Sequence, residues 1–459
     1  MLLIAGRTDG VEEKLRGAEA ALDAILQGTE PDDKARNLVG QIAAARATLA
    51  LTRYDMDTML AQSQRALAYL SSSSLSARAN AHWTLGYAYV LQGDRIKSRQ
   101  ALVEAVSLSK QSGAIFTLIL ASIGLGNVQE ADNQLYQAAE TYQSVLHLAG
   151  EHPQQIIHEA HLGMARICYE WNNLDAAEQY ARQSIQLARQ YDVQVIDRFI
   201  LCEVFLARLK LAQGDLDGCE EILEQVDRSA HRPSFTHRLP EIAAERVRLL
   251  LQQRNLAAAE NLANMHQLPL SQARVYLAQG NFTAAQGLLE GYLQQVEAKG
   301  WQDEQLKGLV LQAVAYQAND EKDRAVQVLG KALELAEPGG FIRTFIDEGL
   351  PMMQLLAHVA VLGIMPDYLG KIVSAFKAEQ KKSEDKSLLP HPPSLIEPLS
   401  HRELEILRLI AQGLSNREIS ERLFLALITV KVHNQKIFGK LQAKSRTEAV
   451  ARARDFGLL

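Results

Sequence analysis

The segment "AQGDLDGCEEIL" (212–223) places the turn Gly214–Asp215 between two helix-forming runs. Short turns of this kind, made of Gly, Asn or Asp, interrupt the chain repeatedly, and each has an apolar helical run before it and another after it. The pattern predicts a series of helical pairs. The other copies are "LQGDRIKSRQAL" (91–102), "EWNNLDAAEQYA" (170–181), "QQRNLAAAENLA" (252–263) and "AQGNFTAAQGLL" (278–289).

The spacing of these turns is close to 40 residues. With the second turn residue as reference, the first four turns lie 79, 42 and 40 residues apart, and "NQLYQAAETYQSVL" (133–146) divides the first interval near its middle. The next steps are 26 and 38 residues. One helical hairpin cannot cover its own apolar face, so a period near 40 indicates a stacked α-solenoid in which each pair is buried on its neighbours. The reference residues are Asp94, Asn173, Asp215, Asn255, Asn281 and Asn319.

Composition places the chain among all-α proteins. Its 459 residues are 47% apolar and 6% aromatic, which is enough for two or three packed domains, and Leu, Ala, Gln and Glu favour helices. The three cysteines, Cys168, Cys202 and Cys219, are odd in number and scattered, so they predict neither a disulfide framework nor a zinc pattern. We expect a reducing, cytoplasmic compartment. The apolar stretch "FTLILASIGLG" (116–126) is too short to span a bilayer, and no signal peptide is evident, so we expect no membrane association.

Composition also predicts the domain boundaries. The helical repeat is expected over residues 1–337, because "EPGG" (337–340) interrupts it, and a closing helical segment is expected over residues 338–377. Residues 378–398 carry charges, Ser and four prolines and are expected to form a semi-stiff linker to a head at residues 399–459. No polar capping repeat is evident at the start, so we expect Met1 to lie inside a longer ancestral solenoid.

The head is basic although the chain is acidic. Residues 399–459 contain 11 Lys and Arg and 6 Asp and Glu, a balance of +5, which leaves −11 for residues 1–398 of a chain whose net charge is −6. This asymmetry favours a head that binds a polyanion, and the alternative is an ordinary solvated surface.

Three Ser-x-x-Glu patterns predict helix starts in the head. In such a capping box the hydroxyl accepts a backbone N–H of the first turn, and the carboxylate accepts the N–H of the cap residue. With Gly413 as a helix stop, they predict helices at about 401–412, 416–423, 428–442 and 446–456. A short helix, a four-residue turn and a longer helix form a helix-turn-helix, which docks its second helix in the major groove of DNA. The three pairs are Ser400 with Glu403, Ser415 with Glu418, and Ser445 with Glu448.

The predicted groove helix has two faces. At 100° per residue, Val430, Ile437 and Leu441 share a side that would face the core, with Asn434 beside them. The outward arc contains ammonium donors, one amide, one apolar side chain and a glycine, and it contains no carboxylate that would repel phosphate. The arc comprises Lys431, Val432, Gln435, Lys436 and Gly439.

Residues 399–450 resemble a LuxR-type DNA-binding domain over their whole length. The resemblance includes Gly413, Ser415, Asn416, Val430 and His433, and it implies a small four-helix domain that binds double-stranded DNA. It implies base contacts by Lys431, Val432 and Gln435, phosphate contacts by Thr429, Lys436 and Lys440, and a structural hydrogen bond for His433. The sequence departs from the family at Ala426–Leu427–Ile428, where a Ser cap is usual. The missing cap destabilises the helix start unless Thr429 caps a helix that begins later.

The rest of the chain resembles the MalT-like branch of these regulators. "LGYAYVLQGD" (85–94) is similar to a tetratricopeptide helix and turn, and "GGFIRTFIDEGLPMMQLL" (339–356) resembles the segment that closes the sensor in that branch. The branch normally carries an ATPase module, but the chain has no P-loop pattern, so we expect no ATP and no other cofactor.

Other candidate sites are less specific. His158 and His161 are one helical turn apart without a zinc-protease pattern, so packed or solvated histidines are favoured over a metal site. Trp83, Tyr87 and Tyr89 are expected in the core, with a concave surface that binds a ligand or a peptide as the alternative. No nucleophile arrangement indicates an enzyme.

Two functions follow from the sequence. The first is a transcriptional regulator whose tetratricopeptide-like solenoid receives a small molecule or a protein and whose head binds promoter DNA, as a dimer where half-sites are paired. The alternative is a non-catalytic interaction scaffold with a degenerate head.

Overall fold

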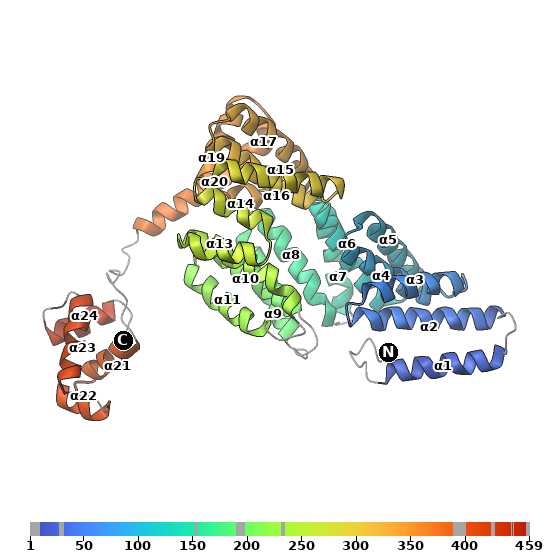
Figure 1. Cartoon of the computed structure of the whole chain (residues 1–459), viewed down its shortest axis with the longest axis horizontal. Helices are drawn as coiled ribbons and strands as arrows, with labels where there is room; N and C mark the ends of the chain where they lie inside the picture. The colour runs from blue at the N-terminus through green and yellow to red at the C-terminus, as the bar shows by residue number, and fades with distance from the viewer. Residues whose placement is uncertain are drawn as a thin grey trace. The chain divides into compact units, whose positions relative to one another are not determined.

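The computed structural model describes residues 10–26, 32–151, 155–189, 198–230, 235–388, 401–423, 427–441, 443 and 445–455. Within these residues every regular element is a helix, which confirms the all-α prediction. The chain divides into two compact units, Met1–Ala375 and Phe376–Leu459. The first contains the helical pairs, which follow one another along the chain in Figure 1.

The first unit is a solenoid of helical pairs, preceded by α1 (Val11–Leu26), which contacts α2. The first helices of the pairs are α2 (Asp33–Leu51), α4 (Leu75–Gln92), α6 (Ile115–Ala131), α8 (His158–Glu170), α10 (Arg198–Ala212), α12 (Leu239–Gln252), α14 (Pro269–Ala278) and α16 (Gln302–Ala318). The second helices are α3 (Met56–Tyr69), α5 (Arg95–Ser112), α7 (Leu135–Glu151), α9 (Leu174–Arg189), α11 (Leu216–Ala230), α13 (Leu256–Met265), α15 (Phe282–Ala298) and α17 (Lys322–Ala336).

The turn residues that set the predicted period are the N-caps of the second helices. Asp94 Oδ1 accepts the Lys97 N–H at 3.0 Å, and Asp215 Oδ1 accepts the Gly218 N–H at 3.0 Å. These bonds satisfy donors that a helix start would otherwise leave unpaired. The same bond is made by Asn173, Asn255 and Asn281.

The residue before each cap has a left-handed backbone. Gly93, Gly214 and Gly280 have φ of 80°, 78° and 75°, a region that glycine enters without a steric penalty. Asp320 has φ of 60° and precedes Glu321, the N-cap of α17. The reference residue of the last turn is therefore Glu321, 40 residues after Asn281, and the choice of Asn319 was wrong. The 26-residue step before Asn281 arises because α13 and α14 have only ten residues each.

Glycines on the first helices allow close packing around a buried tyrosine. Tyr142 on α7 is fully buried, and its hydroxyl donates to Asn127 Oδ1 at 2.7 Å. A Cβ atom on Gly126 would lie 2.5 Å from the Tyr142 ring, and one on Gly163 would lie 2.3 Å from it. Neither position has room for a side chain while the ring stays in place.

Turns far apart in the sequence meet along a line that we call the seam, formed by residues 93–95, 131–136 and 170–172 on one side and 299–303 and 337–344 on the other. Trp301 Nε1 donates to the Gly93 carbonyl at 3.0 Å, and Trp171 Nε1 donates to the Gly339 carbonyl at 2.9 Å. Arg95 Nη1 lies 2.6 Å from Asp303 Oδ1. The seam joins the α4–α8 region to the α15–α18 region, so the solenoid is held by more than contacts between neighbouring pairs.

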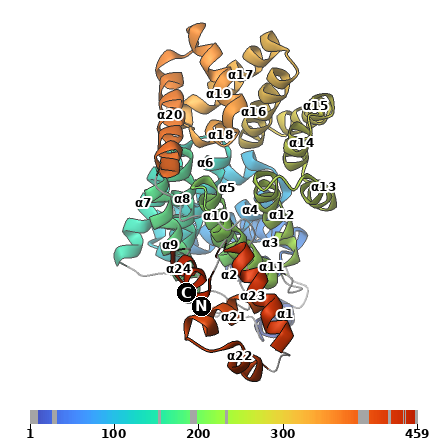
Figure 2. The same cartoon turned by 90° about the vertical axis from the view of Figure 1, so that its left-hand side faces the viewer.

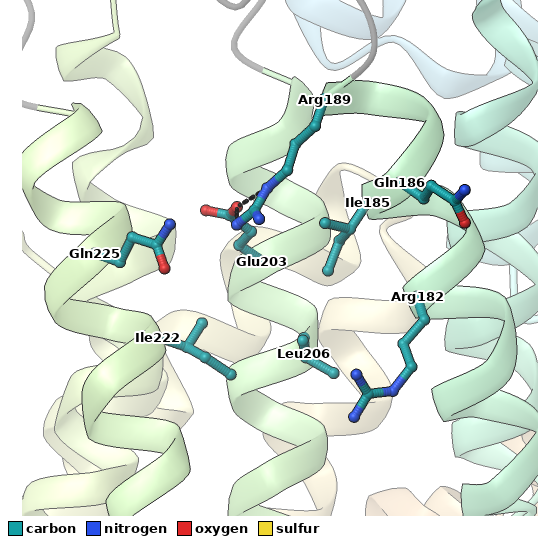
Figure 3. Close-up of a pocket in the computed structure, with 8 residues that line it drawn as sticks. All are labelled: Arg182, Ile185, Gln186, Arg189, Glu203, Leu206, Ile222 and Gln225. Carbon is teal, nitrogen blue, oxygen red and sulfur yellow. Dashed lines mark hydrogen bonds and ion pairs between the residues drawn. The ribbon is translucent and has the colours of Figure 1, made fainter.

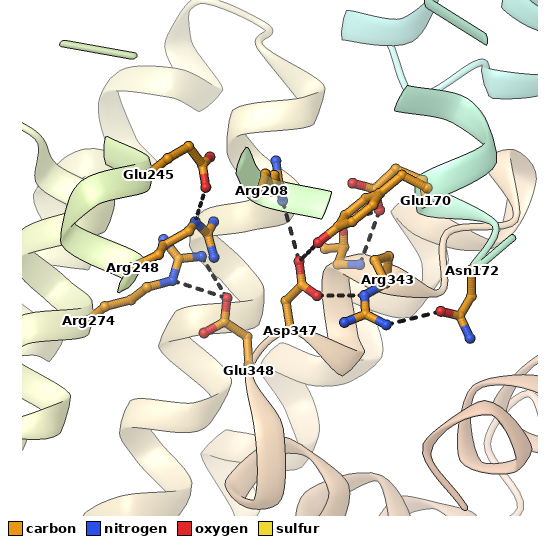
Figure 4. A network of polar contacts seen from close by, with 11 residues as sticks. Glu170, Asn172, Arg208, Glu245, Arg248, Arg274, Arg343, Asp347 and Glu348 are labelled. Carbon is orange, nitrogen blue, oxygen red and sulfur yellow. Dashed lines mark hydrogen bonds and ion pairs between the residues drawn. The ribbon is translucent and has the colours of Figure 1, made fainter. Parts of the chain in front are cut away.

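A buried polar network continues the seam (Figure 4). Asp347 accepts from Arg343 Nε at 2.7 Å and from the Tyr169 hydroxyl at 2.8 Å, and Arg208 lies at 3.5 Å. Burial would raise the pKa of Asp347, but the guanidinium groups of Arg343 and Arg208 outweigh burial and lower that pKa below its usual value. The network fixes α18 (Arg343–Ile346) against α8 and α10, with Thr344 donating to Glu170.

The closing helices are α19 (Gly349–Val361) and α20 (Pro366–Leu388), after a short 3-10 turn at Glu337–Gly339. Residues 378–388 were expected to form the start of a semi-stiff linker, and they are helical instead. They contain Lys, Glu, Gln and Ala, which are good helix formers, and the first proline comes only at position 390. The domain boundaries stay predictions.

We expect Gly163→Ala to lower the free energy of unfolding of the solenoid by about 1–3 kcal/mol, because the new methyl group overlaps the Tyr142 ring. The matched control is Gly287→Ala on α15, where a Cβ would meet nothing within 4 Å. That variant should gain up to about 1 kcal/mol from helix propensity. Urea unfolding, monitored by tryptophan fluorescence, measures the free energy of unfolding of both variants. Equal effects of the two substitutions would contradict the packing of Gly163 against Tyr142.

Candidate nucleic-acid interface

The head has the four predicted helices. They are α21 (His401–Ala411), α22 (Asn416–Arg422), α23 (Leu427–Lys440) and α24 (Arg446–Asp455), each within two residues of the predicted ends (Figure 2). Gly413 has φ of 87°, as expected for a residue that ends a helix in the left-handed region. The core is made by Ile406, Leu407, Ile410, Ile419, Val430, Ile437, Leu441 and Ala449.

The start of α22 is a complete capping box. The Glu418 N–H donates to Ser415 Oγ at 3.3 Å, and the Ser415 N–H donates to Glu418 Oε2 at 2.6 Å. Hydrogen bonding to Ser415 lowers the pKa of Glu418 below its usual value. At α24 the Glu448 N–H donates to Ser445 Oγ at 3.2 Å, and the Glu448 carboxylate pairs with Arg452. Ser400 lies outside the described residues.

Helix α23 has the two faces that the sequence predicts. Val430 and Ile437 are fully buried, Leu441 is almost so, and Asn434 is 7% exposed. On the other side Lys431, Gln435 and Lys436 are exposed, and Val432 is 45% exposed. Gly439 is exposed too, and a Cβ atom there would meet nothing within 4 Å. Helix α23 therefore carries an outward arc of donors and one apolar side chain.

One amide oxygen connects three helices of the head. Asn416 Oδ1, at the start of α22, accepts from Asn434 Nδ2 on α23 at 2.8 Å and from Arg446 Nη1 on α24 at 3.3 Å. Arg446 also donates to the Leu414 carbonyl. These bonds fix the rotation of α23 about its axis and so keep its arc pointing outward. The sequence placed Asn434 near the core but did not predict this contact.

Lys440 has a contact that the sequence did not predict. Its Nζ lies 2.9 Å from Glu403 Oε2, and the Lys440 and Glu403 side chains are 15% and 5% exposed. The pair joins α23 to α21, so Lys440 is directed to the inside of the head. The sequence predicted Glu403 only as the capping-box partner of Ser400. Lys440 is 37 residues away from Glu403, so no local sequence signal indicates their ion pair.

Thr429 does not cap α23. The helix begins at Leu427, so Thr429 lies inside its first turn, and the alternative of a helix that starts after Thr429 is wrong. Ala426 lies outside the described residues.

The remaining candidate residues lie in the solenoid. Trp83 is buried in a core cluster with Leu102 and Ala121, which confirms the core prediction for this residue. The His161 ring lies 5.9 Å from the Tyr180 ring, and burial lowers the pKa of His161. Among the described residues no group of three His, Cys, Asp or Glu could hold a metal ion, and no helix there has the length and apolar character that crossing a membrane requires. Cys168, Cys202 and Cys219 are buried and form no disulfide.

We expect Lys440→Met to destabilise the head by about 3 kcal/mol, because it removes an ion pair from a buried carboxylate. Lys436→Met, on the exposed arc, should change stability by less than about 0.5 kcal/mol. Hydrogen exchange of peptides from α21 and α23 in the full chain measures the stability of the head separately from that of the solenoid. Equal exchange rates in the two variants would show that the ion pair does not stabilise the head.

Two family models match the chain. The MalT-like TPR region matches residues 40–362, and the luxR family of bacterial regulatory proteins matches residues 397–453. The HTH-type transcriptional regulator MalT of Serratia proteamaculans is 26% identical over 451 residues, which are 91% of this chain and 49% of that protein. MalT of Yersinia pestis is 26% identical over 448 residues with the same coverage. The chain thus spans about half the length of these relatives.

Among solved structures, a Rap protein in complex with competence and sporulation factor is similar in fold. The TM-score is 0.54 at 10% identity, and the match covers 71% of this chain and 94% of the Rap chain. This likeness supports the tetratricopeptide-like solenoid. The chain belongs to the family defined by the MalT-like TPR region, and a domain of the luxR regulatory family follows at its C-terminal end.

Proposed function

We propose that the chain is a DNA-binding transcriptional regulator whose solenoid receives an effector and whose head reads promoter DNA with α23. The observation that carries the proposal is the outward arc of α23, where Lys431, Gln435 and Lys436 are exposed beside Val432 and no acid interrupts them. A helix with donors along one face fits the major groove, whose base edges offer acceptors. The names of the relatives, transcriptional regulators, support the same function.

The contacts divide into base readout and backbone contacts. Gln435 can form two hydrogen bonds with adenine, Lys431 can donate to the acceptors of guanine, and Val432 can pack on a thymine methyl group. We assign Lys436 and Thr429 to phosphate contacts, which would fix the register of the head on DNA. Lys440 is engaged by Glu403, so we leave it out of the phosphate contacts.

The sensing role rests on the solenoid. Stacked helical pairs form extended surfaces that bind peptides, proteins or small molecules. The Rap neighbour was solved with a factor bound, which supports a small molecule or a protein as effector here. Paired half-sites in an operator would bring two copies of the head together on DNA.

We expect Lys436→Ala to weaken binding to all duplexes to a similar extent and to lower the slope of log affinity against log salt by about 1, because one phosphate contact is lost. Lys331→Ala is the matched control, since Lys331 is an exposed lysine of the solenoid. Fluorescence anisotropy of the full chain with labelled duplexes from upstream of its own gene gives both slopes. Identical slopes for the two variants would exclude Lys436 from the interface.

We expect Gln435→Ala to cost roughly 1–3 kcal/mol on the preferred duplex and much less on unrelated duplexes, because a base contact is lost while phosphate contacts remain. Competition binding with preferred and scrambled duplexes measures the difference. If Gln435→Ala and Lys431→Ala leave the preference unchanged, the alternative function, a scaffold with a degenerate head, is favoured.

A further inference from the structure

A pocket of about 730 Å³ lies beside the seam. Its walls come from the end of α4, the start of α5, the end of α6 and the turn before α16. Three of these belong to one side of the seam, and the turn with Lys299 and Trp301 belongs to the other. The volume is within the range of small-molecule sites in proteins.

The charged side chains of the wall are mostly cationic, and Gln92 and Asn127 are its neutral polar residues. Arg95, Lys97 and Lys299 line the pocket with Asp94 as the one carboxylate. Lys97 pairs with Asp94 at 2.8 Å, and Arg95 pairs with Asp303. Lys299 Nζ instead lies 4.3 Å from the centre of the Trp301 ring, and no carboxylate of the described residues is within ion-pair distance of it. One ammonium group is thus held in place by an aromatic face and left available to an anion.

The wall also has apolar side chains, and three of them are exposed to solvent. Ile96 is 73% exposed, and Val90 and Leu91 are each 41% exposed. Val128 and Ala131 line the pocket from α6. Exposed apolar side chains next to an available ammonium group suit a ligand that has an apolar body and a negative charge.

A second pocket shows the contrast (Figure 3). It measures about 500 Å³ and is lined by residues of α9, α10 and α11. There Arg189 pairs with Glu203, and Arg182 pairs with Glu178. Both arginines are neutralised, so this pocket has no available cation and serves as an internal control.

We propose that the pocket beside the seam binds a small organic anion with an apolar body, held by Lys299 and by the apolar wall around Ile96. This inference rests on the proposed sensing role and names the class of effector. The ligand would contact both sides of the seam, so it makes all of its contacts only while Trp301 is hydrogen-bonded to Gly93. Occupancy therefore stabilises the closed seam.

The test uses two fluorescent probes with the full chain, 8-anilinonaphthalene-1-sulfonate and its uncharged analogue N-phenyl-1-naphthylamine. Lys299→Glu should raise the dissociation constant of the sulfonate by about tenfold and leave that of the uncharged probe unchanged. Lys299→Gln should raise the sulfonate constant by a smaller factor. Arg182→Glu makes the same charge change in the second pocket and should affect neither probe.

Hydrogen exchange locates the bound probe. Saturating sulfonate should slow exchange in peptides covering residues 90–97 and 299–303, and this protection should disappear in Lys299→Glu. The proposal is overturned if the sulfonate does not bind, or if Lys299→Glu and Arg182→Glu weaken sulfonate binding equally. It is also overturned if the protected peptides lie outside residues 90–97 and 299–303. None of these measurements involves DNA, so their failure is separate from a failure of DNA binding by the head.

Discussion

The structure depends on the apolar face that each helical pair leaves uncovered. In α4–α17 that face is buried on the next pair, as where Tyr142 of α7 fills the space between Gly126 on α6 and Gly163 on α8. The last pair needs a cover of its own, and α18–α20 supply it through Phe345, Met352 and Leu355, all fully buried. Nearest-neighbour burial of this kind makes a long stack stable without a central core.

The seam adds an interaction that a simple stack lacks. The Trp301–Gly93 and Arg95–Asp303 contacts each join residues 208 positions apart. The Asp347 carboxylate contacts Tyr169, Arg208 and Arg343. Buried charges are costly when a partner is removed, so the loss of one residue would destabilise the whole network. The pocket around Lys299 lies beside the seam, at Trp301 and Gly93.

Local signals in the sequence account for much of this molecule. Asp94, Asp215 and Asn255 revealed the period because a helix start needs a cap acceptor, and the Ser415–Glu418 box located α22 for the same reason. The exposed and buried sides of α23 followed from helical geometry alone. These features depend on residues within one or two turns of each other.

Features with distant partners could not be predicted. Nothing in the sequence near Glu403 indicates Lys440, and nothing near Trp301 indicates Gly93. The last turn was misplaced because the N-cap of α17 is Glu321, whereas the other predicted turns have Asp or Asn at that position. Composition did not reveal that residues 378–388 are helical, because they are as polar as a tether and also good helix formers.

The central claim is that the outward arc of α23 enters the major groove, and site-specific photocrosslinking tests it directly. A benzophenone amino acid in place of Val432, which is 45% exposed on α23, should crosslink to bases of a bound duplex. The same group in place of Ala451, exposed on α24, should not. Crosslinking from position 451 but not from position 432 would contradict the account.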